Sequence, residues 1–528
     1  MAQGTQLELE QGRLAILRRL DSVKGQAERN RLGQFATPPS LADEIIEYAC
    51  SQLSPEDRVR FLEPGFGTGS FYCALLRSIH GSRIARALGY EIDAGYAAEI
   101  GAHFRETGLE LRVGDFTTGR PPRSDDDKPN LIVCNPPYVR HHHLSSEQKR
   151  RLQQTAERVT GIRLSQLAGL YCFFLLISHA WLAKNGIAAW LVPSEFMDVN
   201  YGARVKQYLL ERVTCLRIHR FDPKDVQFDN ALVSSAVLIL RRSAPHQEHE
   251  VEFTFGGTLT QPKASRSVPA QTLRREAKWT RFPIHDGALI DKGEPNTLGD
   301  LFRIKRGLAT GCNAFFVLGA EKVAEHGLPS RFLTPILPSP RYLKVDEIRA
   351  DADGEPLIEN RQYLLSCKLS ESEIKMGYPR LWEYLEAGKS LGIPENYLCQ
   401  HRRFWYLQED RPPAPLLCTY MGRQRATARR PFRFILNHSK ATAANVYLLL
   451  YPRPPLATLL KESPDLLSRL WKALSTITPE SMVCEGRVYG GGLHKMEPNE
   501  LANVPATPLL EVLGTRLSMP CRQLMLLD

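Results

Sequence analysis

The chain has 528 residues, 43% apolar and 24% charged, so it is too long for one ordinary core and too apolar for extensive disorder. Its net charge of +10 is uneven: residues 1–250 carry 31 Lys and Arg against 29 Asp and Glu, and residues 251–528 carry 37 against 29. A polyanionic partner would therefore be attracted mainly to the second half.

Several classes of protein are excluded by the distribution of apolar residues and cysteines. The first 26 residues mix charges into their apolar positions, which is unlike a signal peptide, and no segment reaches membrane-spanning length. The eleven cysteines include no C-x-x-C pair, so neither a metal site nor a disulfide framework is indicated. We expect a cytoplasmic protein that binds no membrane, contains no metal and acts as a monomer.

The first half of the chain has the pattern of an α/β domain. After an N-terminal helix, apolar strand candidates recur at intervals that leave room for helices. This alternation predicts a parallel sheet with helical crossovers. The four strands are expected at Val59–Leu62, Ile84–Glu91, Leu109–Val113 and Asn130–Cys134.

The next segments complete the predicted sheet. Leu170–Leu182 suits a buried helix, and Gly186–Val192 suits the strand after it. Cys215–Phe221 and Leu232–Leu240 look like a strand pair, which would close the parallel sheet in antiparallel fashion. We therefore predict a seven-stranded, mostly parallel α/β domain over residues 1–242.

The remainder of the chain is harder to interpret. The pattern weakens over residues 243–296, which are rich in Pro, Ser and charged residues and are expected to be a linker. Residues 297–528 are expected to form a mixed α/β domain. Its clearest elements are helices at Glu371–Ala387 and Ser463–Ile477 and strands at Phe434–Leu436 and Val446–Leu450.

A glycine-rich turn follows the first predicted strand, in the sequence FLEPGFGTGSF at residues 61–71. Glycines at 65, 67 and 69 would let the backbone approach a nucleotide-like ligand closely. Glu91, at the end of the next strand, could accept both hydroxyl protons of a ribose. The pair suits an adenosine-containing cofactor, although dinucleotide-dependent dehydrogenases have a similar arrangement.

The sequence Asn135-Pro136-Pro137-Tyr138 directly follows the strand LIVC and carries the most specific signal. Two consecutive prolines make the loop stiff and remove two backbone donors, so its carbonyls are free to accept hydrogen bonds. If the Asn135 side-chain carbonyl and the Pro136 carbonyl each accept one hydrogen of an adenine amino group, its lone pair is directed toward a methyl donor. Tyr138 would stack on the base. Positioning and electrostatics suffice for such a transfer.

Together, these segments resemble the N6-adenine-specific DNA methyltransferases of the gamma arrangement, the TaqI-like modification methylases of type II restriction-modification systems. There, too, the cofactor segment precedes the catalytic segment and the recognition region follows both. The resemblance covers about the first 242 residues. It implies a class I S-adenosylmethionine-dependent methyltransferase fold, S-adenosyl-L-methionine as cofactor, double-stranded DNA as substrate and a cognate restriction endonuclease acting on the same site. The C-terminal domain would then recognise the DNA target.

The resemblance also implies roles for individual residues. Residues 31–39 resemble a segment that closes over the cofactor, in which Thr37 would contact the methionine part. Leu170–Phe174 matches a stretch near the cofactor and target base, and Phe228 aligns with an aromatic residue that would sandwich the flipped base opposite Tyr138. The implied cofactor-binding residues are Thr37, Glu63, Pro64, Gly65, Gly67, Gly69, Glu91, Ile92, Asp115 and Phe116, and those near the target base are Phe228 and Phe174.

Two clusters in the second half have the composition of a DNA-binding surface. One is a strip of arginines with polar neighbours, and the other, His401–Tyr406, interleaves basic and aromatic residues. An exposed charged surface or core packing is the competing interpretation for both. The strip comprises Arg423, Arg425, Arg429, Arg430 and Arg433, with Asn437, Ser439 and Lys440 nearby.

Four alternatives stay open from the sequence. Similar Asn-Pro-Pro-Tyr loops act on RNA bases or on protein glutamine, although the glutamine enzymes are short and carry their extra domain in front. A DNA-specificity subunit without catalysis is the third, and the intact loop disfavours it. A nuclease centre at Glu373-Ile374-Lys375 is disfavoured by its helix-like setting.

Overall fold

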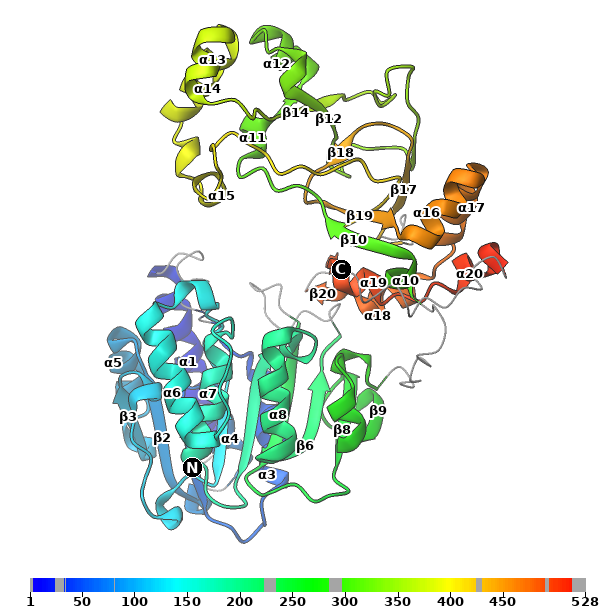
Figure 1. Ribbon diagram of the computed structural model, residues 1–528. Helices are drawn as coiled ribbons and strands as arrows, with labels where there is room; N and C mark the ends of the chain where they lie inside the picture. Colours follow the sequence, from blue (N-terminus) through cyan, green and yellow to red (C-terminus); the bar gives the residue numbers. More distant parts are fainter. Residues whose placement is uncertain are drawn as a thin grey trace. The chain divides into compact units, whose positions relative to one another are not determined.

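The computed structural model describes residues 3–23, 33, 35–79, 81–222, 234–283, 297–423, 430–489 and 493–514 (Figure 1). The chain divides into two compact units. The first comprises residues 1–288 with 489–491, and the second comprises residues 289–488 with 492–528.

The first unit is built on a nine-stranded sheet with the order β3-β2-β1-β4-β5-β7-β6-β8-β9. The strands are β1 Val59–Glu63, β2 Ile84–Glu91, β3 Leu109–Val113, β4 Leu131–Cys134, β5 Ile187–Pro193, β6 Thr214–Arg220, β7 Ser235–Arg241, β8 Glu250–Gly257 and β9 Pro262–Pro269. The helices are α1 Gln3–Val23, α3 Pro39–Ser51, α4 Ser70–Ser78, α5 Ala94–His103, α6 Ser146–Thr160, α7 Leu170–Ile177, α8 Ala203–Glu211 and α9 Ala270–Arg275.

The first seven strands form the predicted fold. Strands β1 to β5 pair in parallel, and β7 inserts antiparallel between β5 and β6. The direction of strand addition reverses at β1, which has β2 on one side and β4 on the other. Ligands of open α/β sheets bind at such reversal points. The prediction of a class I methyltransferase fold is confirmed.

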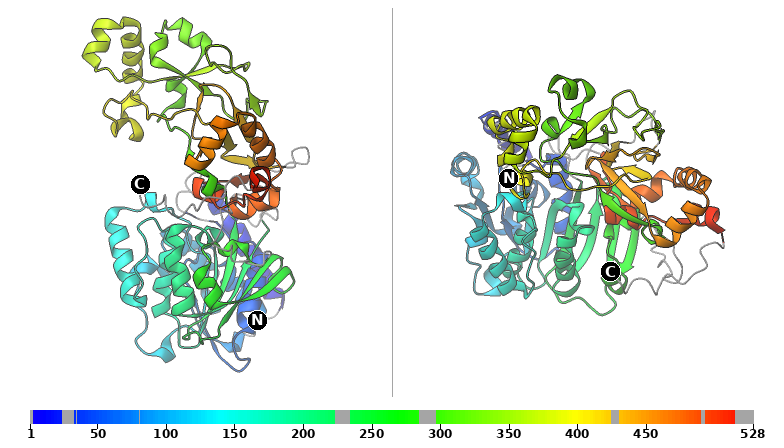
Figure 2. Two further views of the ribbon diagram at one scale, coloured as in Figure 1. Left: turned by 45° about the vertical axis from the view of Figure 1, so that its right-hand side comes forward. Right: turned by 45° about the horizontal axis from the view of Figure 1, so that its top comes forward.

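Alternating side chains of the central strands bury two separate cores. Leu62, Ile132 and Trp190 face a core formed with α6, α7 and α8. Phe61 and Val133 face the opposite core, which includes residues of α3 and α4 and, at its margin, of α1. Helices thus cover both faces of the sheet, with α6, α7 and α8 on one face and α3 and α4 on the other (Figures 1 and 2). This double coverage explains why the parallel strands read as nearly continuous apolar runs.

The structure differs from the sequence-based expectation at the end of the first unit. Residues 250–269, expected within a linker, form the hairpin β8–β9, and β8 pairs in parallel with β6. The sheet therefore has nine strands rather than seven. Val251 and Phe253 are buried in the first core, so the hairpin is part of the domain. The weak sequence signal follows from the edge position of β9, where only one of the eight residues is buried.

The second unit contains three smaller sheets, with the orders β10-β19-β15-β17-β13, β11-β14-β12-β18 and β16-β21-β20. All pairs within the five-stranded sheet are antiparallel except β13 with β17. The strands are β10 Phe302–Arg306, β11 Val317–Gly319, β12 Leu333–Leu337, β13 Glu347–Ile348, β14 Gln362–Leu365, β15 Leu416–Thr419, β16 Met421–Arg423, β17 Phe434–Asn437, β18 Thr442–Ala443, β19 Tyr447–Pro452, β20 Arg487–Tyr489 and β21 Leu493–Lys495.

Short helices surround these sheets. The helix predicted over Glu371–Ala387 is broken at Tyr378, because Pro379 starts a new helix there. The helices are α10 Leu298–Leu301, α11 Asn313–Phe316, α12 Ala320–Glu325, α13 Glu371–Gly377, α14 Pro379–Ser390, α15 Tyr397–Gln400, α16 Pro454–Glu462, α17 Asp465–Leu474, α18 Pro479–Glu485, α19 Pro498–Ala502 and α20 Thr507–Leu513. No helix in the described part of the chain is long and apolar enough to cross a membrane.

Candidate active site

The predicted site residues follow the carboxyl ends of four adjacent parallel strands. Glu63 ends β1 and Glu91 ends β2, whereas Asp115 and Asn135 come just after β3 and β4. Because β1 pairs with both β2 and β4, the glycine turn and the proline loop leave the sheet side by side at its reversal point. A β-carbon added to Gly65 would stand 3.6 Å from the Asn135 carbonyl oxygen, so the two segments are in contact.

The side chain of Asn135 has a fixed orientation. Its amide nitrogen donates to the Phe35 carbonyl at 2.8 Å and to the Thr37 hydroxyl at 3.2 Å. The amide oxygen therefore points the other way, and no described residue donates a hydrogen bond to it. Pro136 and Pro137 bring no backbone N–H groups into the loop. The loop thus presents acceptors held in place by the segment before α3.

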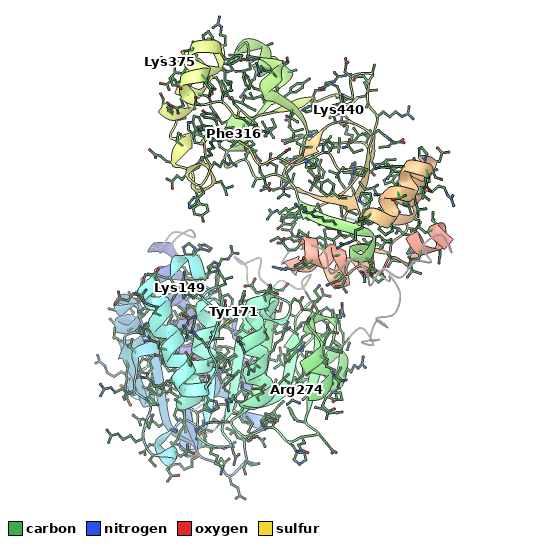
Figure 3. The ribbon with its side chains drawn as sticks, viewed as in Figure 1. Lys149, Tyr171, Arg274, Phe316, Lys375 and Lys440 are labelled. Carbon is green, nitrogen blue, oxygen red and sulfur yellow. The ribbon has the colours of Figure 1, made fainter. Side chains whose placement is uncertain are left out.

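Tyr138 is anchored at its hydroxyl and half-exposed overall. The hydroxyl donates to the Leu191 carbonyl at 3.1 Å, and burial raises the pKa of Tyr138, so the phenol stays neutral. The centroid of the Phe35 ring lies 5.8 Å from that of the Tyr138 ring, and the centroid of the Tyr171 ring lies 6.5 Å from it. Tyr171, on α7, is labelled in Figure 3. A ring tethered at its far end is well suited to stacking.

Gly33 packs directly on this loop. A β-carbon at Gly33 would stand 2.4 Å from the Tyr138 backbone nitrogen, and its φ of 67° lies in the left-handed region that favours glycine. The contact joins the predicted cofactor-closing segment to the catalytic loop. Of that segment, residues 31, 32 and 34 lie outside the described residues.

The glycine turn is held by the carboxylate of Glu91. This buried side chain accepts hydrogen bonds from the Gly67 nitrogen at 2.7 Å and the Asp93 nitrogen at 2.9 Å. Gly67 has a φ of 53°, and nothing lies within 4 Å of the place where its β-carbon would stand. The turn therefore opens on that side, beside the carboxylate predicted to bind a ribose.

A second carboxylate, Glu63, lies beneath the turn. Its side chain is 2% exposed and accepts from the Tyr72 nitrogen at the start of α4 at 3.2 Å. Burial raises the pKa of Glu63 well above its ordinary value, and the charge of Glu91 adds to the increase, whereas hydrogen bonds and Arg13 oppose it. A cationic ligand group would relieve this unfavourable charge.

Two apolar residues at the carboxyl ends of β2 and β3 are exposed. Ile92 is 70% exposed and Val113 is 61% exposed, which leaves an apolar surface at the ends of β2 and β3. Asp115 accepts from Thr117 and pairs with Arg151 at 2.9 Å. An adenine ring fits an apolar surface beside a carboxylate.

Two predicted contact residues are buried instead of facing a ligand. The Phe116 ring is 1% exposed and packs 5.5 Å from Phe174 and 5.3 Å from Trp181. Phe174 is itself buried on α7. Both rings support the site from within the core, because the apolar helix α7 packs against the turn after β3. Phe228 lies outside the described residues.

Several residues that shape this site escaped the sequence reasoning. They are Phe35, which orients Asn135, Arg151, which pairs with Asp115, and Arg13 of α1, which bonds to the glycine turn. Phe35 lies in the predicted closing segment 31–39, although its own role was not foreseen, and Arg13 follows Glu10 at a helical i, i+3 spacing. Phe35 and Arg151 act through a backbone carbonyl or a distant partner.

The predicted DNA-binding strip is only partly available for a ligand. Arg423 and Arg430 are exposed, and Arg425 and Arg429 lie outside the described residues. Lys440 is exposed, although its amine donates to the Asp353 carbonyl at 2.9 Å (Figure 3). Arg433 differs from the expectation, because it pairs with Asp346 and donates to three backbone carbonyls.

Asn437 and Ser439 also differ from the expectation that they contact DNA. Both are buried: the Asn437 amide donates to the carbonyls of Ala414 and Ala441 and accepts from Ser439. Their hydrogen-bonding groups are satisfied inside the fold. They fix the turn after β17 and have no group left for a base edge.

The His401–Tyr406 cluster mostly supports the core of the second unit. Tyr406 is buried, and Trp405 packs against Phe315 and Phe316. Arg402 donates to the carbonyls of Ala309 and Thr310 at 2.8 Å. The core-packing interpretation therefore holds for most of this cluster. No group of three or more His, Cys, Asp or Glu in the described part of the chain could hold a metal ion.

The sequence matches two known protein families. Residues 99–227 match the Eco57I restriction-modification methylases, and residues 278–524 match the C-terminal domain of the type II methyltransferase M.Eco57I. Both halves of the chain thus match type II restriction-modification methylases. The glycine turn and the proline loop at its sheet edge are thus the candidate active site of a methylase.

Individual relatives agree with this assignment. The chain is 29% identical to the type II methyltransferase M.XamI of Xanthomonas campestris pv. amaranthicola, over 89% of this chain and 84% of that protein. It is 24% identical to M.AccI of Acinetobacter calcoaceticus, over 90% and 85%. Among solved structures, the type IIL restriction-modification enzyme MmeI in complex with DNA is similar in fold, with a TM-score of 0.55 and 12% identity, over 93% of this chain and 77% of that chain.

Proposed function

We propose that this methylase transfers a methyl group from S-adenosylmethionine to the N6 amino group of an adenine that has been rotated out of a DNA duplex. The observation that carries the proposal is the orientation of Asn135. Its nitrogen is held by Phe35 and Thr37, so its oxygen is available as an acceptor. An amino group that donates to this oxygen and to the Pro136 carbonyl has its lone pair directed away from the ring system.

The remaining loop residue would hold the base. Tyr138 offers a half-exposed ring whose hydroxyl is fixed to Leu191, so stacking costs little conformational entropy. A base inside a duplex cannot reach a loop at the end of a sheet, so the target must leave the stack. The half-exposed ring thus supports a flipped base as substrate.

The residues at the neighbouring strand ends fit the cofactor. S-adenosylmethionine supplies an electrophilic methyl group on a sulfonium. Glu91 would accept the ribose hydroxyls, Ile92 would lie against the adenine, and buried Glu63 would face the cationic methionine end. Thr37, already bonded to Asn135, would tie the cofactor side of the site to the target side.

The second unit would recognise the DNA. Three observations support this proposal: the charge excess of the second unit, which has 31 Lys and Arg against 26 Asp and Glu, the match to a methyltransferase C-terminal domain, and the exposure of Arg423 and Arg430. The family relation also supports a cognate restriction endonuclease that cleaves unmethylated copies of the same site. The bases that are read depend on side chains that no pattern in this half identifies.

The test compares three acceptors. Purified protein is incubated with methyl-labelled S-adenosylmethionine and duplex DNA, structured RNA or a protein extract, and the product nucleoside is identified by mass. We expect label only in DNA, as N6-methyladenine. Methylcytosine in DNA would refute the base assignment, label in RNA would support the RNA alternative, and DNA binding without methyl transfer would indicate a specificity subunit.

Glu91→Ala tests the cofactor assignment separately. The loss of a charged partner for two hydroxyls should weaken cofactor binding by about 1.5 to 3 kcal/mol, or roughly ten- to hundredfold. Calorimetric titration with S-adenosylmethionine measures this change. Glu248→Ala, an exposed carboxylate in the loop before β8, is the control and should bind normally. Unchanged binding by the Glu91 variant would rule out the assignment.

A further inference from the structure

We propose that Arg13 of the N-terminal helix is a positioning residue for cofactor binding, because it anchors the glycine turn from behind. The inference rests on the proposed function only in naming the ligand of that turn. Arg13 is 0% exposed, so it touches no ligand itself. Its effect must pass through the residues to which it bonds and through its charge, which favours the ionised form of Glu63.

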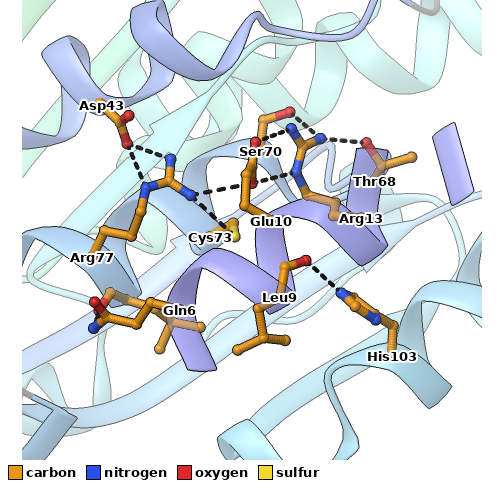
Figure 4. A network of polar contacts seen from close by, with 11 residues as sticks. Gln6, Leu9, Glu10, Arg13, Asp43, Thr68, Ser70, Cys73, Arg77 and His103 are labelled. Carbon is orange, nitrogen blue, oxygen red and sulfur yellow. Dashed lines mark hydrogen bonds and ion pairs between the residues drawn. The ribbon is translucent and has the colours of Figure 1, made fainter. Parts of the chain in front are cut away.

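The contacts of Arg13 reach into the turn (Figure 4). One terminal nitrogen, Nη1, donates to the Thr68 hydroxyl and to the Ser70 hydroxyl, each at 3.0 Å. Thr68 lies between the two left-handed glycines, Gly67 and Gly69, and Ser70 is the first residue of α4. The guanidinium thus joins the turn to the helix that follows it.

The rest of the guanidinium is fixed by a carboxylate on the same helix. Nε donates to Glu10 at 2.9 Å and Nη2 donates to its other oxygen at 2.7 Å, a bidentate pair. Burial opposes ionisation of Glu10, but its bonds and charge contacts with Arg13 and Arg77 outweigh burial, so the pKa of Glu10 lies below its ordinary value. Glu10 therefore stays charged and keeps Arg13 aligned.

A second arginine extends the network to two further helices. Arg77 of α4 donates to Glu10 at 3.1 Å and pairs with Asp43 of α3. The ion pairs alternate in sign, so two arginines and two carboxylates balance each other below the turn. Helix α1 is also attached to α5, because His103 bonds to the Leu9 carbonyl at 2.8 Å. Hydrogen bonds and ion pairs around Arg13 therefore connect four helices, α1, α3, α4 and α5.

The turn needs such an anchor because its own sequence favours movement. Two glycines with positive φ supply little rigidity, and Gly69 at the start of α4 provides no side-chain cap. On the ligand side, the turn is held by Glu91 through the Gly67 nitrogen. That carboxylate is the group expected to engage the ribose, whereas the bonds from Arg13 are independent of the ligand and remain throughout binding and release.

The test replaces the anchor without leaving a buried charge unpaired. In the double variant Arg13→Met with Glu10→Gln, the side chains keep similar volumes, and the amide oxygen introduced by Glu10→Gln can still accept from Arg77. We expect a folded protein whose affinity for S-adenosylmethionine falls at least tenfold. The KM for the cofactor should rise by a similar factor, with kcat and the KM for DNA nearly unchanged.

A matched control comes from the same helix. Arg19 pairs with Glu99 of α5, but both side chains are exposed and neither touches the turn. The double variant Arg19→Met with Glu99→Gln should therefore bind cofactor as the wild type does. If both double variants weaken binding equally, α1 acts only as general support for the fold, and the proposal for Arg13 is wrong.

Hydrogen exchange of the ligand-free protein supplies a readout that needs no activity. In the Arg13 variant the amides of residues 67–72 should exchange faster, whereas those of the central strands should not. Equal exchange and equal cofactor affinity in mutant and wild type would overturn the proposal. If the wild type itself binds no S-adenosylmethionine, the proposed function fails, and the exchange result still decides whether Arg13 anchors the turn.

If the Arg13 double variant does not fold, the acceptors can be removed instead. Thr68→Val with Ser70→Ala leaves the pair of Arg13 and Glu10 intact but deletes both bonds to the turn. This variant should show the same faster exchange and weaker binding. Normal exchange and binding in this variant would equally refute the anchor.

Discussion

Two asparagines illustrate the difference between the two halves of this protein. Asn135 follows β4 in the first unit, and Asn437 ends β17 in the second. Both donate through the amide nitrogen to two acceptors. The oxygen of Asn437 also accepts from the Ser439 nitrogen and hydroxyl, whereas no described residue donates to the oxygen of Asn135. Both the nitrogen and the oxygen of the Asn437 amide therefore have hydrogen-bond partners, whereas the Asn135 amide is held through its nitrogen alone by the described residues.

The difference shows how a structural polar residue can be told from a functional one. A buried amide whose groups are all bonded stabilises a turn and has nothing to offer a ligand. An amide held by one end only is positioned for an acceptor role, because its orientation has been fixed before the substrate arrives. Both residues are asparagines at the carboxyl end of a buried strand, and their bonding patterns separate them in the structure.

The largest expected effect is on catalysis at Asn135. Asn135→Ala should lower kcat by about 10² to 10³, because it removes an acceptor that acts on the reacting amine. Cofactor affinity and thermal stability should stay close to the wild type. Single-turnover methylation of duplex DNA measures the chemical step. If the variant methylates DNA at the normal rate, Asn135 has no catalytic role, and its function is structural like that of Asn437.

Asn437→Ala should give the opposite result. It leaves the carbonyls of Ala414 and Ala441 and the groups of Ser439 without their buried partner, so the second unit should lose about 2 to 4 kcal/mol of stability. Chemical denaturation measures this loss. At a temperature where the variant is fully folded, kcat should match the wild type. A normal stability with altered sequence preference would instead indicate that Asn437 reads DNA.

Tyr138 tests the comparison within the loop. Tyr138→Ala should weaken productive base binding by about 1 to 3 kcal/mol, because the stacking surface is lost. Tyr138→Phe keeps the ring and removes the hydroxyl that bonds to Leu191, so its activity should remain within a few fold of the wild type. A duplex with fluorescent 2-aminopurine at the target position should be brighter when bound to the alanine variant. Equal effects of the two substitutions would exclude stacking.

The smallest effect is expected at the exposed arginines of the second unit. Replacing Arg423 and Arg430 by alanine should reduce the slope of log affinity against log salt by up to about two, because each lost phosphate contact releases roughly one counterion fewer. Titrations of cognate and scrambled duplexes at several salt concentrations measure the slope. Arg380→Ala, an exposed arginine paired with Glu383 on α14, serves as the control. An unchanged slope would leave this strip a solvated surface.

The sequence predicted the first unit well because its signals are local. Strands β2 and β3 have the predicted bounds, since apolar runs between turn residues specify parallel strands. The motifs after β1, β2 and β4 were also found, because each is a short local sequence. The strand order then brings the carboxyl ends of these three strands together. The hairpin β8–β9 was missed because its edge strand has only one buried residue and therefore no apolar run.

The polar residues of the site and of the second unit could not be read in the same way. Whether Asn437 or Arg433 faces solvent depends on backbone carbonyls from segments about 20 to 90 residues away, which no pattern of residue types encodes. The same holds for Arg13, whose acceptors lie 55 and 57 residues further along the chain. Short motifs indicate which reaction a site can carry out. Hydrogen bonds between distant segments determine which polar groups remain available to a ligand.

The pairing of β1 with β4 has a consequence for how the domain assembles. Arg60 of β1 bonds to Asn130, which lies 70 positions further along the chain and just before β4, and this junction brings the glycine turn beside the proline loop. Contacts between remote segments form slowly, because a long loop must close first. Helices should therefore form early in refolding, whereas the glycine turn and the proline loop should come together late. In a refolding experiment, the recovery of S-adenosylmethionine binding should lag behind the far-ultraviolet circular dichroism signal.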